Sequence, residues 1–225
     1  MTEKEESGGS IKMIGFYDYT VILTFLSVIS SVVGMAFALQ ERFLCAIICL
    51  LFSGLCDMFD GMVARTKKNR TEIEKKNGIQ LDSLADIVCF GVFPALIGLV
   101  LARDEKYYVL MVAVAALYIL CGIIRLAYFN VTEEVRQQNE SGKRKSYEGL
   151  PITGAALIVP AFFCMYSVLG SAFPIAYMIL LFLVALCFVL KWKVKKLGMK
   201  GNIVLICIGI VILTVLVVIQ FATWK

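Results

Sequence analysis

A series of apolar stretches close to 20 residues long is the feature that most constrains this chain. A transmembrane helix needs about 20 consecutive apolar residues to cross a hydrocarbon core of about 30 Å. Such stretches recur along the whole chain, and 60% of its 225 residues are hydrophobic. The sequence therefore predicts an all-α, polytopic transmembrane helical bundle with six core spans and a seventh, at residues 20–39, 43–65, 79–102, 107–129, 150–169, 172–190 and 203–222.

The polar stretches divide the chain into three expected parts. Residues 1–19 are a cytoplasmic tail and juxtamembrane segment, and residues 20–190 are a catalytic membrane domain of six helices. Residues 191–225 are a basic loop followed by a C-terminal membrane helix. Two polar segments inside the domain, at 66–77 and 131–146, are expected as loops.

Basic residues fall mostly on one side of the predicted bundle. If the N-terminus is cytoplasmic, 18 of the 22 lysines and arginines lie on the cytoplasmic side. Loops rich in Lys and Arg stay in the cytoplasm, where they meet anionic headgroups. We therefore expect a cytoplasmic N-terminus, and we read the net charge of +5 as a membrane signal with no nucleic-acid partner.

Four aspartates lie near the cytoplasmic ends of two successive predicted spans. Asp57 and Asp60 are in the first of these spans, and Asp82 and Asp86 are in the second. The i, i+3 and i, i+4 spacings place each pair on one helix face, so two facing helices would bring all four carboxylates together. Ionisable side chains at this depth are costly and are candidates for a functional site.

Four neighbouring carboxylates of this kind need positive charge beside them. Oxygen ligands suit hard cations such as Mg²⁺ or Mn²⁺, and two such ions would neutralise the set. Gly61, Ala64 and Gly78 lie on the same faces and lack bulk, so the phosphates of a substrate could approach there. The alternative is close helix packing at the small residues and helix capping by the acids. Two matched pairs of acids argue against it.

The composition excludes some routes of catalysis. The chain has no histidine, which rules out a histidine base or a phosphohistidine intermediate. Its eight cysteines are scattered through apolar stretches without a Cys-x-x-Cys pair, so a disulfide framework is not supported.

The segment from Asp57 to Asp86 resembles the signature of the CDP-alcohol phosphotransferase family. It reads Asp57-x-x-Asp60-Gly61-x-x-Ala64-Arg65, then twelve residues, then Gly78-x-x-x-Asp82-x-x-x-Asp86, with all nine fixed positions filled. The spacer is longer than is usual in the family, which leaves the conformation of residues 66–77 open.

The resemblance implies a role for each of these residues. The four aspartates would bind two divalent cations, Mg²⁺ or Mn²⁺, and Asp86 would also be the catalytic base for an acceptor hydroxyl. The substrate CDP-diacylglycerol would be bound by Gly61, Ala64, Arg65 and Gly78.

Other stretches resemble the membrane-type phosphatidylserine synthases within this family, especially the bacterial ones. These are residues 81–86 with 90–91 and 94–95, residues 125–130, and residues 148–151 with 155–156. The resemblance implies transfer of a phosphatidyl group from CDP-diacylglycerol to L-serine with release of CMP. It also implies an integral protein of the bacterial cell membrane, surrounded by membrane lipids, and leaves a homodimer open.

Three alternatives remain at this point. The acceptor could be another alcohol, such as glycerol phosphate or inositol phosphate, although basic clusters for a second phosphate are lacking within the spans. A related archaeal lipid synthase is a second candidate. A divalent-cation transporter is a third, but its site would lie near the midplane between repeated halves, and no internal repeat is visible.

Arg125 is the candidate for binding the acceptor. Apart from Arg65, the last residue of its span, it is the one basic residue within a predicted span, and its planar guanidinium matches a carboxylate such as that of serine. Asn130 could add a hydrogen bond. The competing roles of Arg125 are binding the lipid-side phosphate of the donor and simple anchoring of a helix end at the interface.

Overall fold

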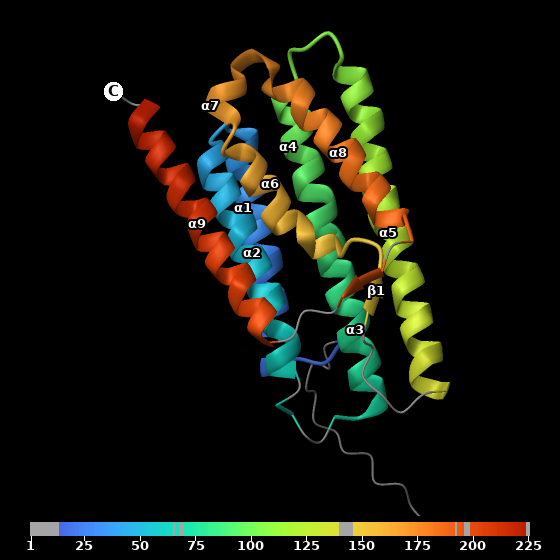
Figure 1. The fold of residues 1–225 in the computed structure, drawn as a ribbon. Helices are drawn as coiled ribbons and strands as arrows, with labels where there is room; N and C mark the ends of the chain where they lie inside the picture. Colours follow the sequence, from blue (N-terminus) through green and yellow to red (C-terminus); the bar gives the residue numbers. More distant parts are fainter. Residues whose placement is uncertain are drawn as a thin grey trace, which may run out of the picture.

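The protein is a bundle of long helices with one small strand pair (Figure 1). The computed structural model describes residues 14–64, 66–67, 70–139, 146–191, 193–195 and 199–223. Among the described helical segments, five are long and apolar enough to cross a membrane, and two shorter apolar helices accompany them. The predicted fold class, a polytopic helical membrane bundle, is confirmed.

The elements follow one another along the chain with short connections. A 3₁₀-helix, η1 (Tyr19–Val21), leads into α1, and a π-helix, η2 (Ile87–Val92), joins α3 to α4. The strands β1 (Ser146–Glu148) and β2 (Lys193–Lys195) pair antiparallel. The helices are α1 (Ile22–Leu39), α2 (Phe43–Ala64), α3 (Glu72–Asp86), α4 (Phe93–Leu101), α5 (Tyr108–Asn139), α6 (Ala155–Phe163), α7 (Tyr166–Leu169), α8 (Phe173–Val189) and α9 (Met199–Thr223), with further 3₁₀-helices η3 (Ile152–Gly154) and η4 (Gly170–Ala172).

The continuous rod formed by α3, η2 and α4 lies at the centre of the bundle. In its apolar window 61% of the residues are buried, against 33–39% in the other long apolar segments. Phe90 and Phe93 of this rod are completely buried, as is Leu50 of α2. Large apolar side chains on the outer faces, such as Val109, are exposed, as expected for helices whose outside meets lipid.

The polar segment 66–77 is only partly a loop, so the prediction was wrong for residues 72–77. The helix α3 begins at Glu72 because Thr71 and Glu74 form a capping box. The Thr71 hydroxyl accepts from the Glu74 amide at 3.2 Å, and the Glu74 carboxylate accepts from the Thr71 amide at 2.8 Å. Six of the twelve spacer residues of the motif therefore extend the second aspartate helix.

Two other predicted boundaries also differ. α5 continues to Asn139, where residues 131–146 were expected as a loop, and an ion pair of 2.6 Å between Arg136 and Glu133 supports the added turns. The expected span at 150–169 is interrupted, because α6 ends at Phe163 and a turn separates it from the single turn of α7. Gly170, with a φ of +50°, then lets the chain reverse into α8.

The π-helix directly after Asp86 is a feature that the apolar pattern did not predict. Pro94 has no N–H, so the carbonyl of Phe90, four residues earlier, lacks the donor that an α-helix would give it. The buried hydroxyl of Tyr118 on α5 donates to this carbonyl at 2.8 Å. A hydrogen bond from a neighbouring helix thus satisfies the backbone inside the membrane and fixes the rod directly behind the aspartates.

Candidate active site

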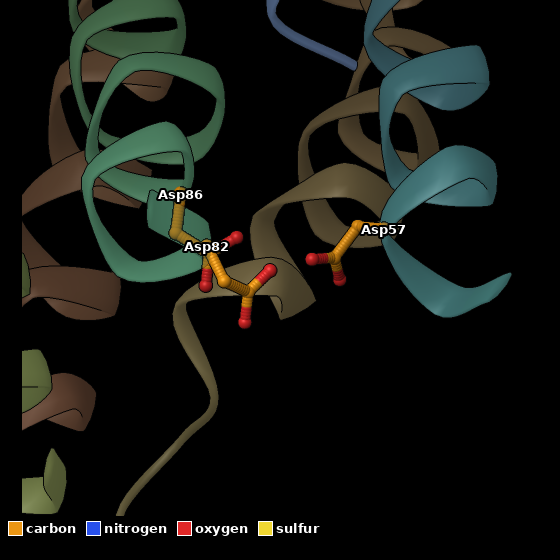
Figure 2. A group of neighbouring side chains, drawn as sticks. All are labelled: Asp57, Asp82 and Asp86. Atoms are coloured by element: carbon orange, nitrogen blue, oxygen red, sulfur yellow. The ribbon is translucent and has the colours of Figure 1, made fainter. Parts of the chain in front are cut away.

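Three aspartates converge between α2 and α3. Figure 2 shows Asp57 pointing from α2 toward Asp82 and Asp86 on α3. Each offers a carboxylate oxygen, and these oxygens lie within 4.8 Å of one another. Asp86 is buried and the other two are half-buried. Because Asp82 and Asp86 are one turn apart, a single helix face presents both to Asp57.

Asp60 is not a member of this group of three, although it lies beside it. It is buried, one turn after Asp57, and its Oδ2 accepts a hydrogen bond of 3.2 Å from the hydroxyl of Thr24 on α1. It lines a cavity together with Asp82 and Asp86. The structure therefore places all four predicted aspartates in one region, with Asp60 turned toward α1.

The cavity beside the aspartates has a volume of about 690 Å³. Its walls come from α1, α2, α3, α5 and the segment between α2 and α3. Both signs of charge are present, because basic side chains of residues 67–76 line it as well as the acids. The small residues Gly61, Ala64 and Gly78 are also part of the lining.

Close helix packing does not explain the two glycines of the motif. A Cβ atom on Gly61 would meet nothing within 4 Å, and one on Gly78 would meet only the guanidinium of Arg70, whose Nη2 would be 2.8 Å away. In contrast, a Cβ on Gly34 or Gly54 would lie 2.4 Å from a side chain of another helix. The packing alternative thus fits Gly34 and Gly54. In contrast, Gly61 borders open space, and Gly78 borders the guanidinium of Arg70.

The two predicted acceptor residues lie on the α5 wall of the same cavity. Arg125 and Asn130 both line it together with Asp86. The side-chain amide of Asn130 donates to the hydroxyl of Ser83 at 2.8 Å, which ties α5 to the turn between the two aspartates of α3. The guanidinium of Arg125 lies over the ring of Phe129, 5.4 Å from its centroid. Arg65 lies outside the described residues.

Sequence reasoning missed the polar residues that α1 and the N-terminal segment contribute. The ammonium of Lys67 pairs with Asp18 at 2.7 Å and with Glu74 at 3.1 Å, so it connects the segment before α1 to the start of α3. Lys67 and Thr20 hold the pKa of Asp18 down, at about 2. The partners are 49 residues apart in the pair with Asp18 and 7 apart in the pair with Glu74, and no local sequence pattern predicts the pair with Asp18. The polar stripe of Thr24, Ser27 and Ser31 on the first span could have been read from its helical spacing.

The donor set fits a hard divalent cation. Asp57, Asp82 and Asp86 offer only oxygen, and among the described residues no lysine or arginine forms an ion pair with them. Carboxylates this close repel one another strongly where water is scarce. A cation with a preference for oxygen, such as Mg²⁺ or Mn²⁺, would compensate their charge.

Known proteins are similar in sequence to this chain over much of the helical bundle. The CDP-alcohol phosphatidyltransferase profile matches residues 20–182. The archaetidylserine synthase of Methanothermobacter thermautotrophicus is 34% identical over 164 residues, which is 72% of this chain and 65% of the relative. The CDP-diacylglycerol–serine O-phosphatidyltransferase of Saccharomyces cerevisiae is 40% identical over 115 residues, or 50% of this chain and 39% of the relative. The enzyme of that name from Helicobacter pylori is 32% identical over 143 residues, or 64% and 56%.

The profile match covers the site, and the three relatives are matched over only part of their length. The chain spans between 39% and 65% of the length of these three curated relatives. The profile match begins before α1 and ends within α8, so it contains the four aspartates, the cavity and the central rod. A match of this extent, around a convergence of carboxylates that the family signature led us to expect, shows that the chain belongs to the CDP-alcohol phosphatidyltransferase family.

Proposed function

We propose that this protein transfers a phosphatidyl group from CDP-diacylglycerol to the hydroxyl of L-serine and releases CMP. The observation that carries the proposal is the meeting of Asp57, Asp82 and Asp86 beside a cavity of about 690 Å³, at the positions of the family signature. Serine is proposed as the acceptor because the names of all three relatives described above contain it.

The aspartates are proposed to hold two divalent cations, Mg²⁺ or Mn²⁺, with Asp60 completing the set. When bound, such a pair supplies charge that polarises the pyrophosphate of the donor and stabilises the departing phosphate. Asp86 is the proposed base. A carboxylate has two oxygens, so one oxygen of Asp86 can accept the proton of the serine hydroxyl while the other stays among the ligands.

The reaction we propose is a single displacement at phosphorus. The serine oxygen forms a bond to the phosphorus of the phosphatidyl group, the bond from that phosphorus to the CMP oxygen breaks, and CMP leaves with the electron pair. The four aspartates are assigned to cations and proton transfer, and the chain has no histidine to form a phosphoenzyme. We therefore propose no covalent intermediate.

We propose that Gly61, Ala64 and Gly78 give the nucleotide and its phosphates access to the cavity wall, with Arg65 also binding the donor. Arg125 and Asn130 are the proposed acceptor site, on the wall formed by α5. The guanidinium of Arg125 would bind the serine carboxylate, and the amide of Asn130 would orient it. The division into residues 1–19, 20–190 and 191–225 and a homodimer remain predictions.

An assay with the purified full-length chain tests this proposal. CDP-diacylglycerol is offered with L-serine, glycerol 3-phosphate or inositol phosphate, and CMP release and the lipid product are followed. Of the three acceptors, we expect only L-serine to give product, and we expect no product from any of them in excess EDTA. The longest of the three matches is to an archaetidylserine synthase, so an archaeal-type CDP-linked donor is assayed in parallel. Product with a phosphorylated alcohol in place of serine would reassign the acceptor, and absence of CMP with every alcohol would refute the proposal.

The acceptor site has a separate kinetic test. Arg125→Lys keeps the charge but loses the planar fork, so we expect the KM for serine to rise and kcat/KM for serine to fall about ten- to a hundredfold. The KM for CDP-diacylglycerol should stay nearly unchanged. A rise confined to the KM for the donor would move Arg125 to the lipid-side phosphate, and unchanged kinetics would make it an anchor of the helix end.

A further inference from the structure

We propose that Arg70, which the family signature does not include, binds the phosphate of the CMP moiety during the reaction. The proposal rests on the proposed function for the identity of the donor. It is argued from the position of the guanidinium, from a donor atom that the protein leaves unsatisfied, and from the charges around it.

Arg70 lies between the two halves of the signature. It precedes Thr71, the N-cap of α3, and its side chain folds back so that Nη1 is 3.5 Å from the carbonyl oxygen of Ala64 at the end of α2. Its Nη2 lies 2.8 Å from the position of a Cβ atom on Gly78. The guanidinium thus lies between Ala64 and Gly78, on the wall of the cavity that Asp60, Asp82 and Asp86 also line.

Within the described part of the chain, the guanidinium has few acceptors. Its Nε is buried without a hydrogen-bond partner, and among the described residues the guanidinium donates only the long hydrogen bond of 3.5 Å from Nη1 to the Ala64 carbonyl. A buried N–H of a charged group that has no acceptor is unfavourable, so an acceptor from outside the chain is expected. A guanidinium has five N–H donors in a planar fork that matches two oxygens of a phosphate.

The nearby acids and amides are already engaged by other groups. Glu72 pairs with Lys75 at 2.6 Å, and Glu74 pairs with Lys67 at 3.1 Å. In the first turn of α3, the capping box engages the amides of Thr71 and Glu74. Among the described cations of residues 66–76, the lysines at 67, 75 and 76 are paired with carboxylates, so Arg70 is the one positioned to meet an anion inside the cavity.

The wall on which Arg70 lies favours the donor over the acceptor. The guanidinium of Arg70 lies beside Gly78. Helix packing does not explain the glycine, because a Cβ atom there would meet only Arg70. Arg125 and Asn130 line the cavity from α5. A phosphate between Arg70 and the aspartates would meet the guanidinium on one side and the cations on the other. Negative charge grows on the CMP phosphate as its bond breaks, so this contact strengthens toward the transition state.

Ligand binding separates this role from a structural one. The full-length protein and its Arg70→Gln and Arg70→Lys variants are titrated with CMP and with cytidine by calorimetry at one fixed Mn²⁺ concentration. We expect Arg70→Gln to weaken CMP binding about tenfold or more and to leave cytidine binding unchanged, since the two probes differ only in the phosphate. Arg70→Lys should recover part of the loss.

Kinetics then place the contact in the reaction. We expect Arg70→Gln to lower kcat and to reduce kcat/KM for CDP-diacylglycerol about ten- to a hundredfold, with an unchanged KM for serine. The matched control is Arg103→Gln, which removes an arginine paired with Glu41 at 3.0 Å in the turn at the other end of the bundle. The control should keep every parameter.

Each remaining outcome overturns the proposal. Equal loss of CMP and cytidine affinity would mean that Arg70 supports the cavity wall and does not bind the phosphate. A rise in the KM for serine alone would place Arg70 at the acceptor, and affinities and kinetics equal to wild type would give it no role. If the wild-type chain released no CMP from CDP-diacylglycerol with any alcohol, the proposed function would fail, whereas the comparison of CMP with cytidine would still decide the role of Arg70.

Discussion

The two ends of the bundle differ in the side chains that they bring together: aromatic rings at one end and carboxylates at the other. At the end near α7, the rings of Phe163, Tyr166, Phe173 and Tyr177 pack with centroids 4.8 to 6.1 Å apart, and the Tyr177 hydroxyl donates to a carbonyl on α4 at 3.0 Å. Toward the other end, where α2 and α3 face each other, carboxylates point toward one another (Figure 2), and they lie beside a cavity. At the first end the Tyr177 hydroxyl bonds within the protein, whereas at the second we propose that cations compensate the carboxylates.

Glycine shows the same contrast in a single residue type. Gly54 lies where a Cβ would be 2.4 Å from the Cβ of Ala156, so its lack of a side chain lets α2 and α6 approach. Gly61 lies two turns further along α2, and a Cβ there would meet nothing within 4 Å. The difference teaches that a small residue in a membrane helix has to be judged by what its missing side chain would touch.

The largest effect is expected from a charge change in the aspartate group. Asp82→Asn should lower transfer at least a thousandfold, since it removes a proposed cation ligand. It should also raise the thermal stability measured in EDTA, because one of several neighbouring carboxylates no longer repels the others. A fall in activity together with a rise in stability would show that the aspartates destabilise the fold and are needed for function.

The matched change at the aromatic end should act in the opposite way. Tyr177→Phe deletes only the hydroxyl that bonds to Pro94, so stability should fall by about 1 kcal/mol while transfer stays at the wild-type rate. The measurements are the transfer assay and thermal unfolding in detergent. An Asp82→Asn variant that loses stability in EDTA, or a Tyr177→Phe variant that loses activity first, would break the comparison.

The two ends should also face different compartments. Because 18 of the 22 basic residues fall on the side of the aspartates, we expect that end in the cytoplasm. In a chain carrying Cys207→Ser, a cysteine at Lys75 should react with a membrane-impermeant maleimide only after permeabilisation. A cysteine at Asp104, exposed in the turn between α4 and α5, should react in intact cells. The reverse pattern would overturn the orientation.

The sequence was sufficient for the parts of this site that depend on local spacing. Apolar length predicted the bundle, and the i, i+4 spacing of Asp82 and Asp86 predicted a shared face toward Asp57. The start of α3 was missed because its charged residues were read as a loop, although Thr71 and Glu74 have the spacing of a capping box. This error came from giving composition more weight than helix-end chemistry.

Other features could not be predicted because they depend on residues far apart in the chain. The π-helix after Asp86 is supported by a hydroxyl on α5, and the ion pair of Lys67 with Asp18 joins residues 49 positions apart. The place of Arg70 beside Gly78 depends on how the segment before α3 folds back. None of these follows from periodicity, which reports only the faces of single helices.

A smaller, two-sided effect is expected from the glycines. Gly54→Ala would force its new methyl group against Ala156, and overpacking of this kind costs about 1–3 kcal/mol. Gly61→Ala should leave stability unchanged or slightly raised, since alanine favours the helix. It should nevertheless lower kcat/KM for CDP-diacylglycerol about tenfold, if the donor occupies the space beside it. Wild-type kinetics for Gly61→Ala would show that the donor does not approach there.

The smallest effect concerns the ion pair that attaches the N-terminal segment to the aspartate end. Lys67 holds the pKa of Asp18 at about 2, below its usual value of 3.8. A lowered pKa means that the stabilisation is present above about pH 4 and is lost as the pH falls through about 2. Both side chains are partly exposed, so Asp18→Asn should reduce stability by no more than about 1 kcal/mol near neutral pH. Thermal unfolding of the two proteins should show this difference from pH 5 to 8, and the difference should shrink as the pH falls from about 4 through about 2. A difference that persisted undiminished at pH 2 would mean that Asp18 stabilises the segment through contacts other than its charge.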